Sequence, residues 1–211
     1  MLLRAALVLT ALALNALATS SIPLPLLFEQ NTGQAEPRSQ YLARGQGYEI
    51  HLQPGGISLV RGENTVRMRL DGANPAPRIV GRELQEAKAN YLIGDRARWR
   101  TGVPLYRLVE YQKVYPGIDL VFYGNGRELE YDFSLAPGAE VGQIGVSFEG
   151  VEQLRIEGGE LVVKTAFGEI RHRKPRIYQR RNGRKVEVSG RFVLRSPRQA
   201  GFTCGSATRA R

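Results

Sequence analysis

The chain has 211 residues, and its 30 Lys and Arg residues outnumber its 20 Asp and Glu residues, so the formal net charge is +10. This length suits one domain, or two small ones, with enough chain for a hydrophobic core. The single cysteine, Cys204, excludes an intrachain disulfide, so packing must stabilise the fold.

The N-terminus has the three parts of a secretory signal: Arg4, an apolar run over residues 5–14, and the small residues of Ala16-Leu17-Ala18. We predict that residues 1–18 are a signal peptide, that residues 19–27 are a leader, and that the protein is secreted to the extracytoplasmic cell surface. No later segment approaches the roughly 20 apolar residues of a spanning helix, so we expect no membrane span. An exported basic chain meets envelope polysaccharide, lipid headgroups or a surface protein, and no nucleic acid.

Short alternating runs cover most of the remaining chain. Residues 48–52, 57–59 and 66–70 predict half-buried antiparallel strands, and residues 71–78 a loop. Residues 83–89 have the composition of a short helix. After residue 103, short runs alternate with glycine turns, which favours an all-β fold, either an antiparallel sandwich or a partly closed barrel built of hairpins.

We place this β-domain at residues 28–195. Two hairpins have turns that contain Gly-Gly, at residues 55–56 and 158–159, which suggests two related halves near 28–80 and 103–195. Residues 196–211 lose the alternation, so we expect a disordered or truncated tail.

The strongest local pattern predicts a hairpin around Asn125-Gly126, a pair suited to a type I′ turn. Such a turn sets Phe122 opposite Leu129 on one face of the hairpin. That face is apolar, so we expect it to lie in the core.

The other face of the hairpin is acidic, with Asp119 expected opposite Asp132 and Glu130 on the same side. Directly opposed carboxylates repel unless a cation or a shared proton intervenes. Three interpretations follow: a strand face covered by Lys and Arg, a Ca²⁺ site made of these three residues, or a glycosidase carboxylate pair. The first is favoured, because structural ion pairs imitate functional sites.

A basic run follows between residues 171 and 185. Arg171, Arg173, Lys174 and Arg176 could bind an anionic polymer through Arg contacts to sulfate or phosphate. The alternative is a charged edge strand that discourages sheet aggregation, and we favour it.

The His, Ser and Cys residues of the chain do not have the spacing that common metal or catalytic sites require. His51 and His172 are far apart in the sequence with no Cys or His at ligand spacing, so we expect no zinc site, and His51 is expected to face solvent. No serine or cysteine has a nucleophile setting. We therefore expect no catalytic residue, no cofactor other than Ca²⁺, and no enzyme. Trp99 is expected in the core.

An ordered series of motifs resembles the N-terminal domain that precedes seven-bladed β-propeller (SBBP-type) repeats in bacterial cell-surface proteins. The series consists of Asn31-Thr32-Gly33-Gln34, Asn90-Tyr91-Leu92-Ile93-Gly94, Trp99-Arg100-Thr101, Val103-Pro104, residues 114–119, residues 129–133 and Pro175-Arg176-Ile177-Tyr178-Gln179. The resemblance implies a non-enzymatic binding or scaffold domain. The alternative is a carbohydrate-active enzyme or a Ca²⁺-dependent glycan-binding module that uses the acidic face. Because the chain changes character at Ser196, it is either a stand-alone relative or a truncated one.

Overall fold

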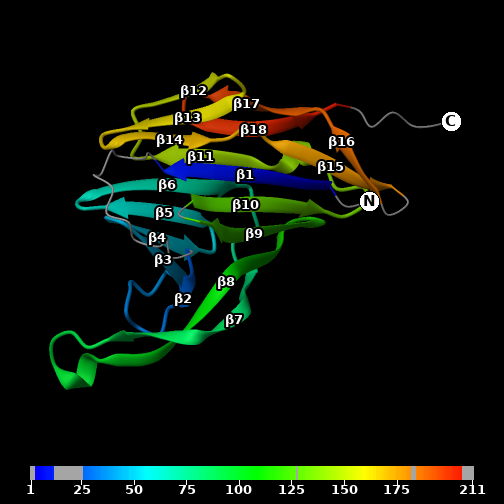
Figure 1. Cartoon of the computed structure of the whole chain (residues 1–211). Coiled ribbons are helices and arrows are strands. Elements are labelled where there is room, and N and C mark those ends of the chain that lie inside the picture. Colours follow the sequence, from blue (N-terminus) through cyan, green and yellow to red (C-terminus); the bar gives the residue numbers. More distant parts are fainter. Residues whose placement is uncertain (1–2, 12–25, 127, 182–183, 206–211) are drawn as a thin grey trace.

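The computed structural model describes residues 3–11, 26–126, 128–181 and 184–205, and these residues form an all-β protein (Figure 1). The strands are β1 (Leu3–Ala11), β2 (Phe28–Gln30), β3 (Tyr41–Gly45), β4 (Tyr48–Gln53), β5 (Gly56–Arg61), β6 (Asn64–Asp71), β7 (Arg78–Tyr91), β8 (Arg100–Tyr115), β9 (Ile118–Asn125), β10 (Glu128–Leu135), β11 (Gly145–Glu149), β12 (Gln153–Glu157), β13 (Glu160–Thr165), β14 (Gly168–His172), β15 (Arg176–Arg181), β16 (Arg184–Val188), β17 (Gly190–Ser196) and β18 (Gln199–Cys204). Two short 3-10 turns, η1 (Arg96–Arg98) and η2 (Val141–Gln143), are the helical elements of this described part.

The strands form one large antiparallel sheet. Its ladder runs from β17 through β18, β11, β6, β5, β4, β3, β2, β8, β9, β10, β1, β14 and β13 to β12, with β7 paired to β8 and β15 paired to β1 and β16. The sheet curves so that its two ends, β12 and β17, lie in contact. No ladder joins these two strands among the described pairings, so the sheet is not a closed barrel. The all-β antiparallel prediction is confirmed.

Alternating burial explains why the predicted strands form. In β6, Val66, Met68 and Leu70 are buried, while Arg67 and Arg69 between them are exposed. This period of two is the pattern of a strand with one face in the core. The predicted hairpin between β4 and β5 has the expected register, and so does the one between β12 and β13. The two suggested halves do not form separate sheets, because β6 pairs with β11 and β2 pairs with β8.

The core joins the central hairpin to the C-terminal strands. Aromatic rings of β10 and β18 meet, with 6.0 Å between the centroids of Phe133 and Phe202, and Phe202 lies 5.1 Å from Phe192 of β17. Tyr131 lies 5.9 Å from Phe133 in an edge-to-face arrangement. Such pairs add stabilisation beyond their buried area.

The predicted register of the β9–β10 hairpin is wrong by two residues. Asn125 pairs with Glu128 and so belongs to the strand and not to the turn, and Phe122 lies opposite Tyr131. Gly126 has the positive φ of 60°, whereas Asn125 belongs to the strand, where its side chain donates to Glu130 Oε1 at 2.6 Å. A shift of two leaves each side chain on its predicted face, so the apolar face lies in the core as expected.

Two further sequence-based predictions are wrong. Residues 83–89 lie in β7 and not in a helix, because this short segment gains more from pairing with β8. The predicted tail is also ordered in part, since β18 pairs with both β11 and β17 and buries Ala200 and Phe202. The domain therefore extends past the predicted end at residue 195 and includes β18.

The N-terminal segment contributes a strand. β1 pairs with β10 on one side and with β14 and β15 on the other. The predicted cleavage site after Ala18 lies outside the described residues, and removal of the signal peptide stays a prediction. Among the described residues, no helix has the length and apolar character needed to cross a membrane.

Candidate functional site

The carboxylates predicted to hold Ca²⁺ each have a protein partner. Asp119 lies opposite Ser134 and not opposite Asp132, and its Oδ1 accepts the backbone N–H of Lys113 at 2.6 Å. Asp132 accepts the Tyr123 hydroxyl at 3.2 Å. Burial, followed by the carboxylates of Asp132 and Glu130, raises the pKa of Tyr123, which keeps its proton in place.

The buried Glu130 accepts the Asn125 amide. Because Asp119 lies opposite Ser134, the direct repulsion from Asp132 that suggested a cation is absent. No group of three or more His, Cys, Asp or Glu residues suited to a metal occurs in the described part of the chain. Ca²⁺ binding by Asp119, Glu130 and Asp132 stays a prediction.

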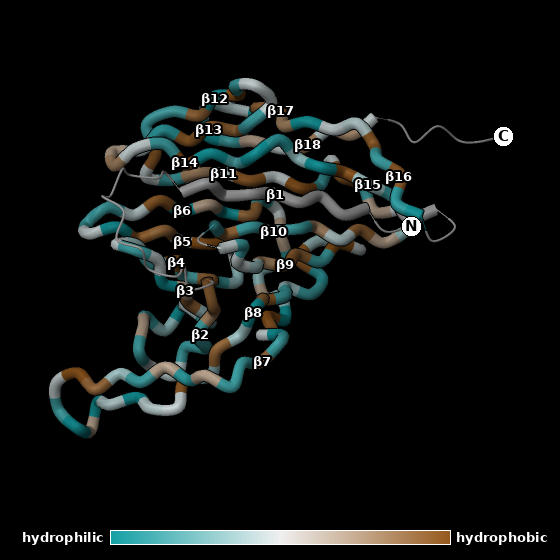
Figure 2. Tube along the Cα trace, in the orientation of Figure 1, coloured by the Kyte–Doolittle hydropathy of each residue, from teal (hydrophilic) through white to brown (hydrophobic). Residues whose placement is uncertain are grey.

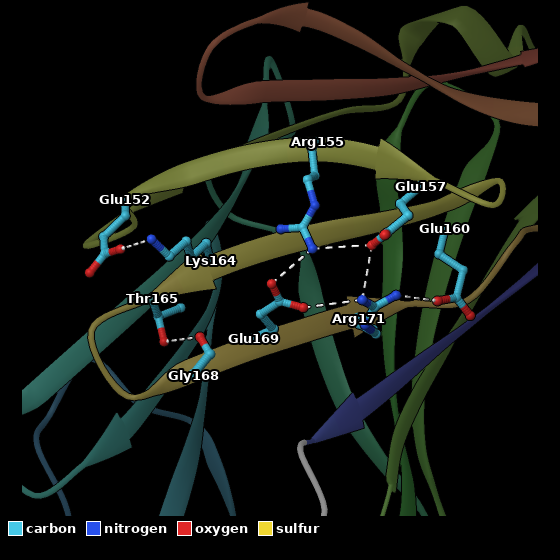
Figure 3. A network of polar contacts seen from close by, with 9 residues as sticks. All are labelled: Glu152, Arg155, Glu157, Glu160, Lys164, Thr165, Gly168, Glu169 and Arg171. Carbon is cyan, nitrogen blue, oxygen red and sulfur yellow. Dashed lines mark hydrogen bonds and ion pairs between the residues drawn. The ribbon is translucent and has the colours of Figure 1, made fainter.

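The predicted basic site is largely ion-paired within the protein. Arg171 of β14 bonds to three glutamates, with nitrogen–oxygen distances of 2.9 Å to Glu157, 3.2 Å to Glu160 and 3.1 Å to Glu169 (Figure 3). Arg155 of β12 shares two of these carboxylates, as the dashed lines in Figure 3 show. Hydrogen bonds from the two arginines lower the pKa of the carboxyl groups of Glu157 and Glu169.

The other residues of the basic run divide between surface and core. Arg173 is paired with Glu128 at 2.9 Å, while Lys174 and Arg176 are exposed. His172 is buried and its Nδ1 lies 3.2 Å from the Tyr131 hydroxyl. Two of the four cations thus have glutamate partners, and binding of an anionic polymer by Arg171, Arg173, Lys174 and Arg176 stays a prediction.

A pocket of about 820 Å³ lies beside Asp119. Residues 72–75, 115–119 and 134–136 line it, together with Glu110, Gln112 and Lys113. Lys113 has a positive φ of 53°, a strained conformation for this residue. Glu110 is paired with Arg82 at 2.7 Å, and Asp119 accepts the backbone N–H of Lys113, so both carboxylates of the pocket already have protein partners.

The strongest candidate is a projecting arm, the hairpin of β7 and β8. Figure 1 shows the two green strands leaving the body of the sheet and ending in a loop far from it. The strands contain 14 and 16 residues, much longer than an ordinary strand. We define the arm tip as residues 92–99, which lie between the paired residues Tyr91 and Arg100.

The arm tip exposes large apolar side chains. The exposed fraction is 56% for Leu92, 78% for Ile93 and 37% for Trp99. The Trp99 Nε1 donates to the Gly94 carbonyl at 3.2 Å, and the guanidinium of Arg96 lies over the indole ring, 5.7 Å from its centroid. The expectation that Trp99 belongs to the core is therefore wrong. The apolar Leu92-Ile93 pair directly before the Gly94 turn was the signal that could have indicated an exposed tip.

The body of the protein holds the base of the tip in place. The Tyr91 hydroxyl donates to Glu29 of β2 and accepts from Nε of Arg44, which is 2.9 Å away on β3. Burial and Glu29 raise the pKa of Tyr91 to about 12. Arg100 Nε donates to the Thr32 carbonyl at 3.2 Å. The tip is thus presented in a defined position.

The sheet and the arm define an all-β domain that presents a hydrophobic and cationic tip. The chain belongs to the family described as domain of unknown function DUF7948, whose model matches residues 28–211. This match includes β18, in agreement with the ordered C-terminal strand. Neither the curated proteins nor the solved structures contain a match to the chain.

Proposed function

We propose that the chain is an exported, non-enzymatic binding or scaffold domain of the cell surface, and that it contacts its partner through the arm tip. The observation that carries this proposal is the exposure of Leu92, Ile93 and Trp99 at the end of the arm. The signal sequence supports export. The motif series supports a place beside β-propeller repeats in a larger surface protein.

Exposed apolar residues concentrate on the arm. Within the described residues, seven large hydrophobic side chains are exposed, and four of them belong to the arm: Leu84, Leu92, Ile93 and Trp99. Clustered apolar groups in water commonly mark an interaction site. A projecting tip is convex, so it suits contact with another surface better than enclosure of a small substrate.

A shortened arm tests this proposal. Because Tyr91 pairs with Arg100, replacing residues 92–99 by Asn-Gly closes the same two strands with a two-residue turn. The supports from Glu29, Arg44 and Thr32 stay in place. We expect the variant to keep its melting temperature within a few degrees and to lose cosedimentation with isolated bacterial cell envelopes. Binding equal to that of the parent protein would refute a role for the tip.

The pocket beside Asp119 favours a second candidate, a Ca²⁺-dependent glycan-binding module or a carbohydrate-active enzyme. Its test is a glycan array with and without Ca²⁺, using the parent protein and Asp119→Asn. Ca²⁺-dependent binding that the substitution abolishes would support this candidate. Signals that change with neither Ca²⁺ nor the substitution would exclude it.

A further inference from the structure

We infer that the arm tip binds the surface of an anionic lipid bilayer, an inference that rests on the proposed role of the tip as the binding surface. Figure 2 shows a hydrophobic segment beside hydrophilic ones at the far end of the arm. This combination of apolar side chains and cations at one exposed end is the composition of an interfacial membrane anchor.

The charge of the tip selects an anionic partner. The arm tip contains two basic residues, Arg96 and Arg98, and one acidic residue, Asp95, and the basic Arg100 follows it directly on β8. The carboxylate of Asp95 accepts the Ala97 backbone N–H at 3.0 Å and caps η1. Within the described part of the chain, no carboxylate lies within ion-pair distance of Arg96, Arg98 or Arg100. This differs from Arg155 and Arg171 of the body, whose charges glutamates offset.

The indole N–H of Trp99 already has a hydrogen-bond acceptor within the tip, which lowers the cost of moving the ring out of water. Its only polar hydrogen already bonds to Gly94, so moving the ring into the headgroup region leaves no donor without a partner. Tryptophan is enriched at this depth of a bilayer for the same amphipathic reason. Arg96, stacked over the ring, keeps its charge next to the lipid phosphates.

The shape of the tip favours a bilayer over a protein or a polysaccharide. A glycan chain needs a groove along which it can lie, whereas Leu92 and Ile93 are 56% and 78% exposed on a projecting end. A fluid bilayer accepts such a projection without a complementary cavity. Anionic lipid headgroups then attract Arg96 and Arg98, and the apolar pair enters the acyl boundary.

The fluorescence of Trp99 tests the inference directly. It is the single tryptophan of the chain, so its emission reports the tip and not the apolar N-terminal run. With the full chain, vesicles of phosphatidylcholine and phosphatidylglycerol should move the emission to shorter wavelength. Vesicles of phosphatidylcholine alone should not. An unchanged emission with the anionic vesicles would overturn the inference, and so would an equal response to soluble dextran sulfate.

Matched substitutions separate the tip from the body. Ile93→Ser should weaken vesicle binding about tenfold or more, a step that corresponds to one buried aliphatic side chain. The control is Ile156→Ser on β12, whose side chain is also exposed. Arg96→Gln with Arg98→Gln should weaken binding by a similar factor, whereas Arg67→Gln with Arg191→Gln, exposed arginines of β6 and β17, should change it less than twofold. Equal losses in tip and body variants would overturn the inference.

The two proposals fail in different ways. If the shortened-arm variant loses envelope binding but the parent protein does not bind anionic vesicles, the tip is a binding surface and its partner is not lipid. If the shortened arm binds envelopes normally, the proposed function itself fails.

Discussion

His172 is a titratable side chain enclosed by aromatic rings. Phe148 lies 5.5 Å and Tyr131 6.1 Å from the imidazole, measured between ring centroids. Burial lowers the pKa of His172 from 6.5 to about 3. The imidazole is therefore neutral in the folded protein at physiological pH, and it serves packing and the hydrogen bond to Tyr131.

This pKa predicts a loss of stability in acid. Above about pH 6.5 the ring is neutral in both the folded and the unfolded chain, so it adds no pH dependence. Below that pH only the unfolded chain takes up the proton, so the free energy of unfolding falls by up to about 1.4 kcal/mol per pH unit down to about pH 3.

Urea unfolding between about pH 7 and pH 5 measures that slope. His172→Phe removes the titration, and the slope over this range should become shallower whatever its effect on absolute stability. Parallel slopes for the parent protein and the variant would contradict the assignment.

Gly126 is the glycine whose backbone freedom the central hairpin needs. Its φ is 60°, and a Cβ added there meets no atom within 4 Å. Gly126→Ala should therefore cost about 1–2 kcal/mol, entirely from the left-handed backbone conformation. Gly55→Ala is the control, because that turn residue also has open space but no positive φ. Chemical denaturation measures both variants, and equal losses would mean that the φ at residue 126 is not the cause.

Burial of single residues could be predicted only in part from the sequence. Alternation correctly predicted that Val66 and Met68 are buried, because both side chains lie on the face of β6 that packs against the core. The same reasoning failed for His51, which is only 8% exposed and whose Nδ1 lies 3.0 Å from the Ser39 hydroxyl. The second face of its strand is covered by a neighbouring loop, and a pattern within one strand carries no information about that cover. The prediction for Trp99 was wrong in the opposite sense, because this residue lies in the loop at the end of the arm, away from the core.

At the scale of elements, β18 shows the same limit. It lacks a clear alternating pattern, yet it lies between β11 and β17 and so connects the C-terminal hairpin to the rest of the sheet. The prediction of a disordered tail is therefore wrong for residues 199–204. Deleting residues 196–211 should remove the partner of two strands and abolish the cooperative thermal transition.

A point substitution tests β18 without truncation. Phe202 is buried against Phe133 and Phe192, so Phe202→Ala should cost about 3–5 kcal/mol. The adjacent Thr203 is exposed, and Thr203→Ala should change stability by less than about 0.5 kcal/mol. Denaturant midpoints compare the two variants. Similar small losses at both positions would show that β18 does not pack as described.

The candidate site was less predictable than the fold. The acidic and basic clusters were visible as residue types, but partners such as Glu128 for Arg173 come from strands that are distant in the sequence. The arm was hidden because residues 83–89 favour a helix by composition, while pairing with β8 decides their conformation. Pairing between strands that are distant in the sequence therefore explains both why these predictions were wrong and why the arm was missed.

At the scale of the whole molecule, the predicted signal peptide overlaps a strand of the sheet. β1 occupies the position between β10 and the pair β14 and β15. The same residues carry the predicted signal peptide. If the chain is cleaved after Ala18, β10 loses the hydrogen-bond partners on one edge and keeps those of β9 on the other.

Hydrogen exchange of the full chain and of a chain that begins at Thr19 tests whether β1 protects the amides of β10. Successive residues of an antiparallel strand direct their hydrogen bonds to opposite neighbours, so β10 contains two sets of amides. In the shorter chain, the set that faces β1 should exchange faster, and the set that faces β9 should stay protected. The amides between β5 and β6 serve as the control, because both strands lie far from β1 in the ladder. Equal protection of both β10 sets in the two chains would mean that another segment replaces β1 or that β1 does not pair with β10.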